Sequence, residues 1–329
     1  MTMRRKILIA LGMSAASAAL TALAQLRAGP RRIGYYSGGS VQNSVPFLAA
    51  FREGMAELGW VEVRDYVIDA RHGDGDAKAM PALADELLAA RPDLLLTVTD
   101  DAVRTLAQKT GTIPIVMTTS QDPVANGVAA SLRRPGGNVT GLTGAVEGLT
   151  GKHLQLLKEA VPRLAQVALL LEPANVSVPS QLKDIEAAAV SLRMRVSPIE
   201  IRQAADIEAA FKRGAALGAQ GYVVSASSSL FNSQRQALAD GAARAKVPAI
   251  FPSSNFADAG GLLSYGFSPL NNYRRAAAYV DKIFKGAKPG ELPIEQPTRY
   301  EMAVNLKTAK ALGLTIPQSV LLRADRVIK

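Results

Sequence analysis

The sequence of 329 residues contains no cysteine and only two histidines, His72 and His153. The absence of cysteine excludes disulfides, thiolate metal sites, cysteine nucleophiles and lipids attached through cysteine. Two histidines leave little material for a histidine metal cluster, so we expect neither a metal ion nor a cofactor. Aromatic residues make up only 5% of the chain, whereas 48% of the residues are hydrophobic and 20% are charged. This composition indicates a globular protein, and the length suggests about two domains.

The first 24 residues combine a cationic start at residues 4–6, an apolar run at residues 7–23, and the small residues Ala22 and Ala24. This pattern is typical of a secretory signal peptide that is cleaved after Ala24. An uncleaved membrane anchor is the alternative, since a run of about 17 apolar residues reaches the lower limit for a membrane-spanning helix. We expect cleavage, and therefore an exported protein, because the small residues stand where signal peptidase requires them. Since the chain has no cysteine, we expect no lipid anchor.

The net charge of the chain is +10, and it is unevenly distributed. The first 24 residues carry +3, and residues 265–329 carry 11 basic and 5 acidic side chains. The intervening residues are nearly neutral and an exported chain meets no chromosome, so we expect no nucleic-acid partner. The basic residues near the carboxyl end form either a solvated surface or a face that docks a partner.

Short β-rich runs alternate with amphipathic helical stretches along the chain, which is the pattern of parallel α/β layers. The expected strands are residues 32–37, 66–70, 93–99, 114–119, 138–143, 166–171, 195–201, 221–225, 248–251, 262–267 and 300–305. Helices are expected between them, among them one near residues 232–245. In the first helix Phe47, Phe51, Met55 and Leu58 recur at helical spacing, so we expect them to share one buried face. Because the layout repeats, the sequence predicts two doubly wound α/β lobes joined by more than one strand.

Small polar residues stand at the carboxyl ends of the expected strands in both halves of the chain. Ligands of open parallel sheets bind beyond these ends, where loops and helix N-termini present backbone N–H groups. For a single residue the alternative is that it caps a helix. The candidate ligand-binding residues are Ser37, Gly38, Ser40, Thr99, Asp100, Thr119, Ser120, Asn175, Ser225, Ser227, Ser253 and Tyr265. Tyr265 is included because its ring could stack on a ligand at an expected crossing between the halves.

Sequence signatures of enzymes are absent, so we expect no catalytic residues. No G-x-G-x-x-G follows the first strand, and no G-x-S-x-G elbow occurs. The stretch around Gly151 and Lys152 resembles a phosphate loop only faintly, because Val146 stands where glycine is required. Neither histidine has a serine close to it in sequence that would suggest a nucleophile and base.

Four sequence runs resemble a known family. They are SLRRPGGNVTGLT (131–143), GKHLQLLKEAVP (151–162), YRRAAAYVDKIFKGAKP (273–289) and LPIEQPTRYEMAVNLKTAKALGLTIPQSVLLRAD (292–325). They are similar to the ABC-transporter substrate-binding proteins, which include tryptophan- and tyrosine-binding members. The resemblance implies the type I periplasmic-binding fold, in which three strands cross between two lobes that close on a ligand. The resemblance implies a first lobe of residues 31–142 plus 268–295 and a second lobe of residues 143–267 plus 296–329. The expected signal peptide, residues 1–24, precedes both lobes.

The resemblance further implies a periplasmic, monomeric receptor that delivers a small polar solute, an amino acid or a small aromatic compound, to an inner-membrane ABC permease. If the ligand is an amino acid, we expect Asp100 to hold its ammonium group. The chain departs from the family pattern at Asp100 and Asp101 and at Glu172, where ligand is expected, so the specificity of relatives does not carry over. Two alternative functions remain. A ligand-sensing regulator of the same fold would need a DNA-binding module before Arg31, where only about thirty, mostly apolar residues stand. An exported hydrolase would need a nucleophile and a base across the cleft, and the sequence shows no such motif.

Overall fold

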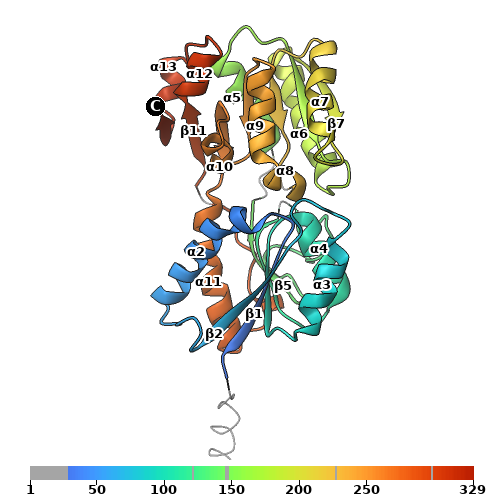
Figure 1. Cartoon of the computed structure of the whole chain (residues 1–329), viewed down its shortest axis with the longest axis vertical. Coiled ribbons are helices and arrows are strands. Elements are labelled where there is room, and N and C mark those ends of the chain that lie inside the picture. The colour runs from blue at the N-terminus through green and yellow to red at the C-terminus, as the bar shows by residue number, and fades with distance from the viewer. Residues whose placement is uncertain (1–28, 121, 145–147, 227, 298) are drawn as a thin grey trace, which may run out of the picture.

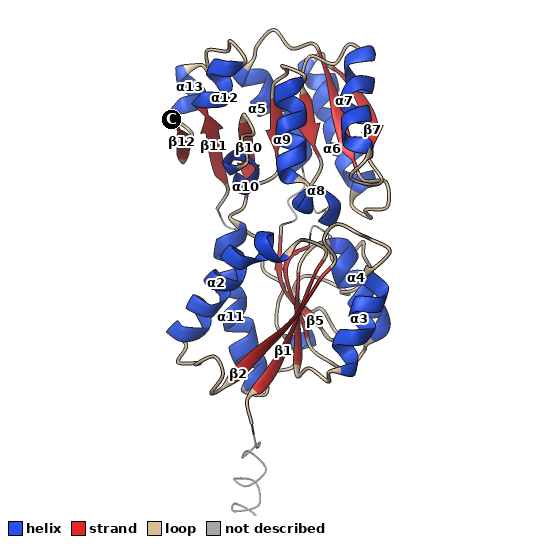
Figure 2. Cartoon of the chain, viewed as in Figure 1, coloured by secondary structure: helices blue, strands red, loops and turns tan. Residues whose placement is uncertain are grey.

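The computed structural model describes residues 29–120, 122–144, 148–226, 228–297 and 299–329. The expected signal peptide, residues 1–24, lies outside the described residues. The chain folds into two α/β lobes that lie one above the other and meet in the middle of the molecule (Figure 1). Each lobe has a sheet with helices on both faces (Figure 2).

The first lobe has a five-stranded parallel sheet in the order β2-β1-β3-β4-β5. Its strands are β1 (Arg31–Ser37), β2 (Tyr66–His72), β3 (Leu94–Thr97), β4 (Ile115–Ser120) and β5 (Val139–Thr143). Its helices are α2 (Val41–Glu57), α3 (Met80–Ala89), α4 (Asp100–Lys109), α11 (Pro269–Phe284) and the 3₁₀ turn η1 (Pro289–Glu291). Although α11 comes late in the chain, it returns to this lobe and packs beside α2 (Figure 1).

The second lobe has a seven-stranded sheet in the order β12-β11-β10-β9-β8-β6-β7. Its strands are β6 (Gln166–Leu171), β7 (Arg195–Glu200), β8 (Tyr222–Val224), β9 (Ala249–Phe251), β10 (Leu263–Gly266), β11 (Glu301–Asn305) and β12 (Arg326–Ile328). Its helices are α5 (Leu149–Ala160), α6 (Val178–Leu192), α7 (Asp206–Ala216), α8 (Ser229–Ser233), α9 (Arg235–Arg244), α10 (Ser254–Asp258), α12 (Leu306–Ala311) and α13 (Gln318–Leu321). Only β10 and β11 pair antiparallel among these described strands.

The chain passes between the lobes three times: after β5, after β10 and before β11. The predicted fold class, two doubly wound α/β lobes joined by three crossings, is confirmed. Two details differ from the sequence prediction. The expected helix at residues 232–245 is broken at Gln234, which leaves helical geometry and separates α8 from α9. The short strand β12 was not predicted, because its three residues carry little apolar pattern of their own.

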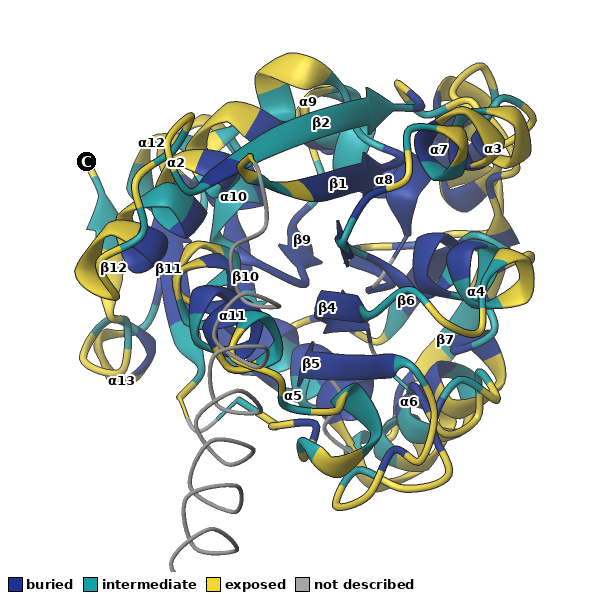
Figure 3. Ribbon diagram, turned by 90° about the horizontal axis from the view of Figure 1, so that it is seen from below, coloured by how far each residue is buried: buried dark blue, intermediate teal, exposed yellow. Residues whose placement is uncertain are grey.

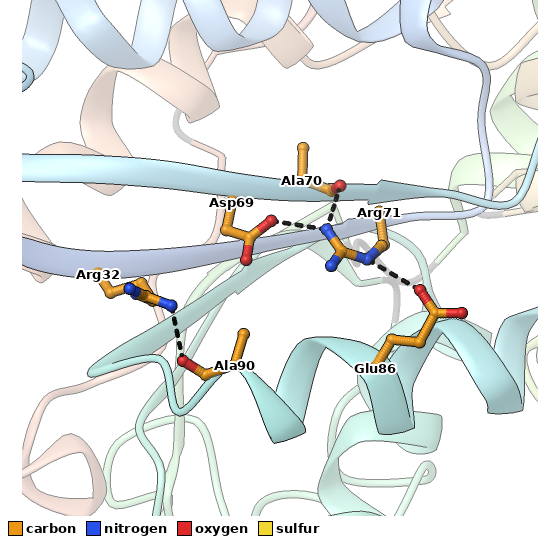
Figure 4. A network of polar contacts seen from close by, with 6 residues as sticks. All are labelled: Arg32, Asp69, Ala70, Arg71, Glu86 and Ala90. Atoms are coloured by element: carbon orange, nitrogen blue, oxygen red, sulfur yellow. Dashed lines mark hydrogen bonds and ion pairs between the residues drawn. The ribbon is translucent and has the colours of Figure 1, made fainter.

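Burial decreases from the centre of the first sheet to the edge at β2, whereas β5 at the opposite edge is fully buried. All four residues of β3 are buried, and so is most of β1. Strand β2, in contrast, is partly exposed along nearly its whole length, as its colour beside the buried part of β1 shows (Figure 3). Charged side chains on this edge discourage pairing with another strand. Arg71 of β2 contacts Asp69 at 2.6 Å and Glu86 of α3 at 3.1 Å, and Arg32 donates to the Ala90 carbonyl at 2.9 Å (Figure 4).

Helix α2 packs one face against the sheet of the first lobe and against α11, while its residue Phe47 faces the space between the lobes. Leu48, Phe51 and Met55 are buried at helical spacing. The prediction that Leu58 shares this face is wrong, because Leu58 lies past the helix end and is 41% exposed. Phe47 is only partly buried and faces the space between the lobes.

Gly54 lets α2 and α11 approach closely. A Cβ atom at Gly54 would lie 2.3 Å from the Arg274 carbonyl oxygen, so no larger residue fits this crossing without moving a helix. On α11, Tyr273, Ala276 and Val280 are buried against the same core. This contact fixes where α11 begins, and therefore where Tyr273 stands relative to the junction of the lobes. Among the described helices, none is both long and apolar enough to cross a membrane.

Candidate functional site

A cavity lies at the junction of the two lobes and is lined by residues from both. It is narrow, with a volume of about 70 Å³. The first lobe contributes Tyr35, Ser37, Gly39, Asn43, Ser44, Phe47, Val98, Thr99, Thr119, Pro269 and Tyr273, with Phe267 at the crossing after β10. The second lobe contributes Ala226, Ser229, Asn232, Arg235, Pro252, Ser253 and Asn255.

One wall of the cavity is aromatic. The rings of Phe47 on α2 and Tyr273 on α11 stack with their centroids 5.2 Å apart and their planes 22° apart. Behind them, the hydroxyl groups of Tyr35 and Tyr273 are 2.9 Å apart. Burial keeps the pKa of Tyr273 well above its usual value, so its phenol is neutral. Tyr273 is 1% exposed, so it is mainly the partly exposed ring of Phe47 that offers apolar surface to a ring-shaped ligand.

Beside the cavity the lobes bond to each other along a seam. The seam consists of Asn43, Thr99, Asp100 and Asp101 in the first lobe and Ser177, Ser229, Asn232 and Ser233 in the second. Asp100 is its centre, because its side chain accepts hydrogen bonds from Ser120 at 2.5 Å and Asn126 at 2.9 Å within the first lobe. It also accepts one from Ser177 of the second lobe at 2.6 Å.

Ser229 makes the second set of bonds in the seam. Its hydroxyl oxygen lies 2.7 Å from the Thr99 hydroxyl oxygen and donates to Asp101 at 3.0 Å. Burial raises the pKa of Asp101, although bonds from Thr99 and Ser229 oppose the shift. Burial likewise raises the pKa of Glu172, which accepts a bond from Ser228 at 2.5 Å. Asp101 and Glu172 line a second hollow between the lobes, with a volume of about 470 Å³, and neither lines the cavity described above.

The twelve residues predicted from strand ends are divided between the cavity, the seam and the supporting structure. Four of them line the cavity: Ser37, Thr99, Thr119 and Ser253. Gly38 instead faces Ser229 across the seam, and Asp100 and Ser120 bond to each other as described. Ser227 lies outside the described residues.

The remaining predicted residues lie behind these two features. Ser40 caps α2 by accepting a bond from the Asn43 amide at 3.2 Å. Asn175 donates to the Ala226 carbonyl at 3.1 Å. The hydroxyl of Ser225 is buried and has no hydrogen bond within the described part of the chain. Tyr265 stacks on Tyr300 with ring centroids 5.6 Å apart.

Sequence reasoning missed several residues that line the cavity. Asn43 and Phe47 lie in the first two turns of α2, and Tyr273 lies in the first turns of α11. Arg235 is the first residue of α9, and it reaches the cavity because the helix predicted over residues 232–245 is interrupted just before it. A polar or aromatic residue in the first turns of a helix was the available signal, since helix N-termini meet the cleft in this fold.

The structure also brings one serine and one histidine together. The Ser44 hydroxyl oxygen lies 3.3 Å from Nδ1 of His72, and the hydroxyl donates to the Ser40 carbonyl at 3.0 Å. Burial lowers the pKa of His72. Among the described residues no acid hydrogen-bonds the other ring nitrogen of His72, so the third member of a hydrolytic triad is missing there. No group of acidic or histidine residues that could hold a metal ion occurs in the same part of the chain.

Comparisons with known proteins agree with this geometry. A family model described as "ABC transporter substrate binding protein" matches residues 46–328. A tyrosine-binding protein of Clostridioides difficile (strain R20291) is 22% identical over 264 residues, which cover 80% of this chain and 75% of that protein.

Solved structures show the same fold. The structure of an ABC domain in complex with L-Trp from Streptococcus pneumonia has a TM-score of 0.83 and 23% identity, covering 91% of this chain and all of that one. A ligand-free, open substrate-binding protein with adhesive properties from Clostridium difficile has a TM-score of 0.64 and 20% identity, covering 91% of this chain and 99% of that one. The match of the family model over most of the sequence shows that this chain belongs to the ABC transporter substrate-binding proteins, a family of non-catalytic binding proteins.

Proposed function

We propose that this chain is the periplasmic substrate-binding component of an ABC importer, which captures a small solute between its lobes and delivers it to an inner-membrane permease. One observation carries the proposal: the cavity is lined from both lobes and is flanked by hydrogen bonds that join them. Such a site forms only when the lobes close, so ligand contacts from both lobes add in the closed state. The open, ligand-free relative from Clostridium difficile supports hinge opening.

The finer parts of the proposal concern ligand, site and compartment. The solute is an amino acid or a small aromatic compound, as supported by the aromatic wall and by relatives named for tyrosine and L-Trp. Ser37, Thr99, Thr119 and Ser253 are the proposed polar contacts, because they line the cavity. We further propose that the receptor is monomeric, binds no nucleic acid and has its leader removed after Ala24.

Titration of the purified protein with a library of amino acids, small aromatic compounds and purines tests this function. We expect saturable binding of at least one compound by calorimetry, together with a rise in melting temperature, since a ligand that binds only the folded state stabilises it. Protein taken from the periplasmic fraction is expected to begin at Gln25. Folded protein that binds nothing in a broad library would contradict the receptor function.

Replacing Ser177 with alanine is expected to weaken binding of the ligand found in this way by about tenfold. The Ser177 hydroxyl donates to Asp100 of the other lobe, and a bond to a carboxylate is worth roughly 1.5–3 kcal/mol when it is lost. The matched control is Ser180→Ala, because the Ser180 hydroxyl donates to the Ser177 carbonyl of its own lobe at 2.9 Å. Calorimetry measures both affinities, and an equal loss in the two variants would show that the seam does not contribute to closure.

A further inference from the structure

The charge that lines the cavity is positive. Among the described residues that line it, Arg235 is the only charged side chain. Its guanidinium makes a single hydrogen bond within the described part of the chain, from Nη1 to the Asn232 carbonyl at 3.3 Å. Because a guanidinium has five N–H donors, most of its capacity remains for a ligand.

Arg235 makes no ion pair with any of the described residues. Burial lowers its pKa, and the acid that opposes this shift, Asp258, is ion-paired with Arg326. Arg235 stays charged even so, because a guanidinium does not lose its proton in proteins. A positive charge that is partly removed from water, and whose nearby acid is already paired with another arginine, favours binding of an anionic ligand.

The carboxylates near the lobe junction do not line the cavity that Arg235 lines. Asp100 is 1% exposed and accepts bonds from three side chains in and beside the seam. Asp101 and Glu172 line the second hollow between the lobes, of about 470 Å³. None of the three lines the cavity, so a ligand ammonium group would find no carboxylate among the described lining residues.

The rest of the cavity selects for a ring. The stacked pair Phe47 and Tyr273 forms one wall, and Phe267 lines the cavity at the crossing between the lobes. A planar carboxylate matches the guanidinium fork through two parallel hydrogen bonds, while a ring packs on the aromatic wall.

We propose that the ligand is an aromatic carboxylic acid without a charged amino group, whose carboxylate binds Arg235 and whose ring packs against Phe47 and Tyr273. This inference rests on the proposed receptor function and narrows its ligand class. An aromatic amino acid brings the same ring and carboxylate, but it also brings an ammonium group that must lose water without gaining a carboxylate partner.

Calorimetry with two matched sets of compounds tests the ligand class. One set is 3-(4-hydroxyphenyl)propionate, L-tyrosine and tyramine, and the other is indole-3-propionate, L-tryptophan and tryptamine. In at least one set we expect the acid to bind at least about tenfold more tightly than the amino acid, and the amine to show no saturable binding. Tighter binding of the amino acid would overturn the inference and leave the receptor function standing.

Variants of Arg235 test the role assigned to this residue. Arg235→Gln is expected to weaken binding of the acid about 30-fold, and Arg235→Lys is expected to recover part of that loss, since lysine keeps the charge but not the fork. Arg244→Gln, at the exposed far end of the same helix, is the control and is expected to bind like the wild type. Unchanged affinity in Arg235→Gln would overturn the assignment.

The outcomes separate this inference from the proposed function. Saturable binding of an uncharged or cationic library compound, with none of the acids, would refute the ligand class but support a receptor. Absence of binding by every compound in both experiments would count against both proposals.

Discussion

Replacing Gly38 with alanine is expected to lower ligand affinity about 100-fold while leaving the fold intact. A Cβ atom at Gly38 would lie 2.5 Å from Cβ and 2.7 Å from Oγ of Ser229, in the other lobe. The nearest atom that it would meet in its own lobe is Cε of Met80 at 3.7 Å, which is an ordinary contact. The added methyl group therefore clashes only when the lobes are closed. Overpacking costs roughly 1–3 kcal/mol, and here that cost shifts the equilibrium toward the open state.

A second substitution tests this explanation. Ser229→Gly removes both atoms that the new methyl group would meet, and it also removes the bonds to Thr99 and Asp101. Calorimetry should therefore show that Gly38→Ala combined with Ser229→Gly binds about as well as Ser229→Gly alone. Gly111→Ala, at a position where a Cβ meets nothing within 4 Å, is the control for the glycine change itself. Wild-type affinity in Gly38→Ala, or a matching drop in its free energy of unfolding by urea, would contradict a role in closure.

The layers of this fold could be predicted from the sequence because each depends on local pattern. The run Leu94–Thr97 is apolar at every position but the last, and such a run is typical of a strand buried on both faces. The order of the strands depends on contacts between distant segments instead. The antiparallel pairing of β10 with β11 arises because the chain leaves the lobe after β10, forms α11, and returns. No local pattern specifies that return.

The site could be predicted only in part, for a related reason. Strand ends locate the junction of the lobes, and so four of the predicted residues, Ser37, Thr99, Thr119 and Ser253, line the cavity. The sequence does not show on which side of a strand end the cavity lies. For this reason it could not show that Asp100, which is adjacent to Thr99, bonds to the other lobe in the seam instead of lining the cavity. The aromatic wall escaped prediction because its two rings come from helices that are more than 200 residues apart and meet only through the packing of α2 on α11.

Acid is expected to destabilise the second lobe through His153, which the fold holds neutral. His153 lies on α5, is fully buried, and its Nε2 is 2.6 Å from the Tyr265 carbonyl oxygen, to which it donates in the neutral form. Its Nδ1 has no hydrogen bond within the described part of the chain, and the rings of Tyr265 and Tyr300 stack beside it. A proton on Nδ1 would therefore be buried without an acceptor there. Burial lowers the pKa of His153 from 6.5 to about 4.

The sign and size of the effect follow from proton binding. Between pH 6.5 and pH 4 the unfolded chain binds a proton at His153 and the folded chain does not, so stability falls as the pH falls through this window. At pH 4 the loss amounts to about 3 kcal/mol, since each pKa unit is worth about 1.36 kcal/mol. Urea unfolding at several pH values should show this loss in the wild type but not in His153→Gln, which keeps a donor for the Tyr265 carbonyl and does not titrate. His72→Gln is the control: burial lowers the pKa of His72 as well, but this variant should retain the part of the acid sensitivity that His153 causes, because His153 is still present. Parallel pH profiles for the wild type and His153→Gln would show that His153 does not cause the acid lability.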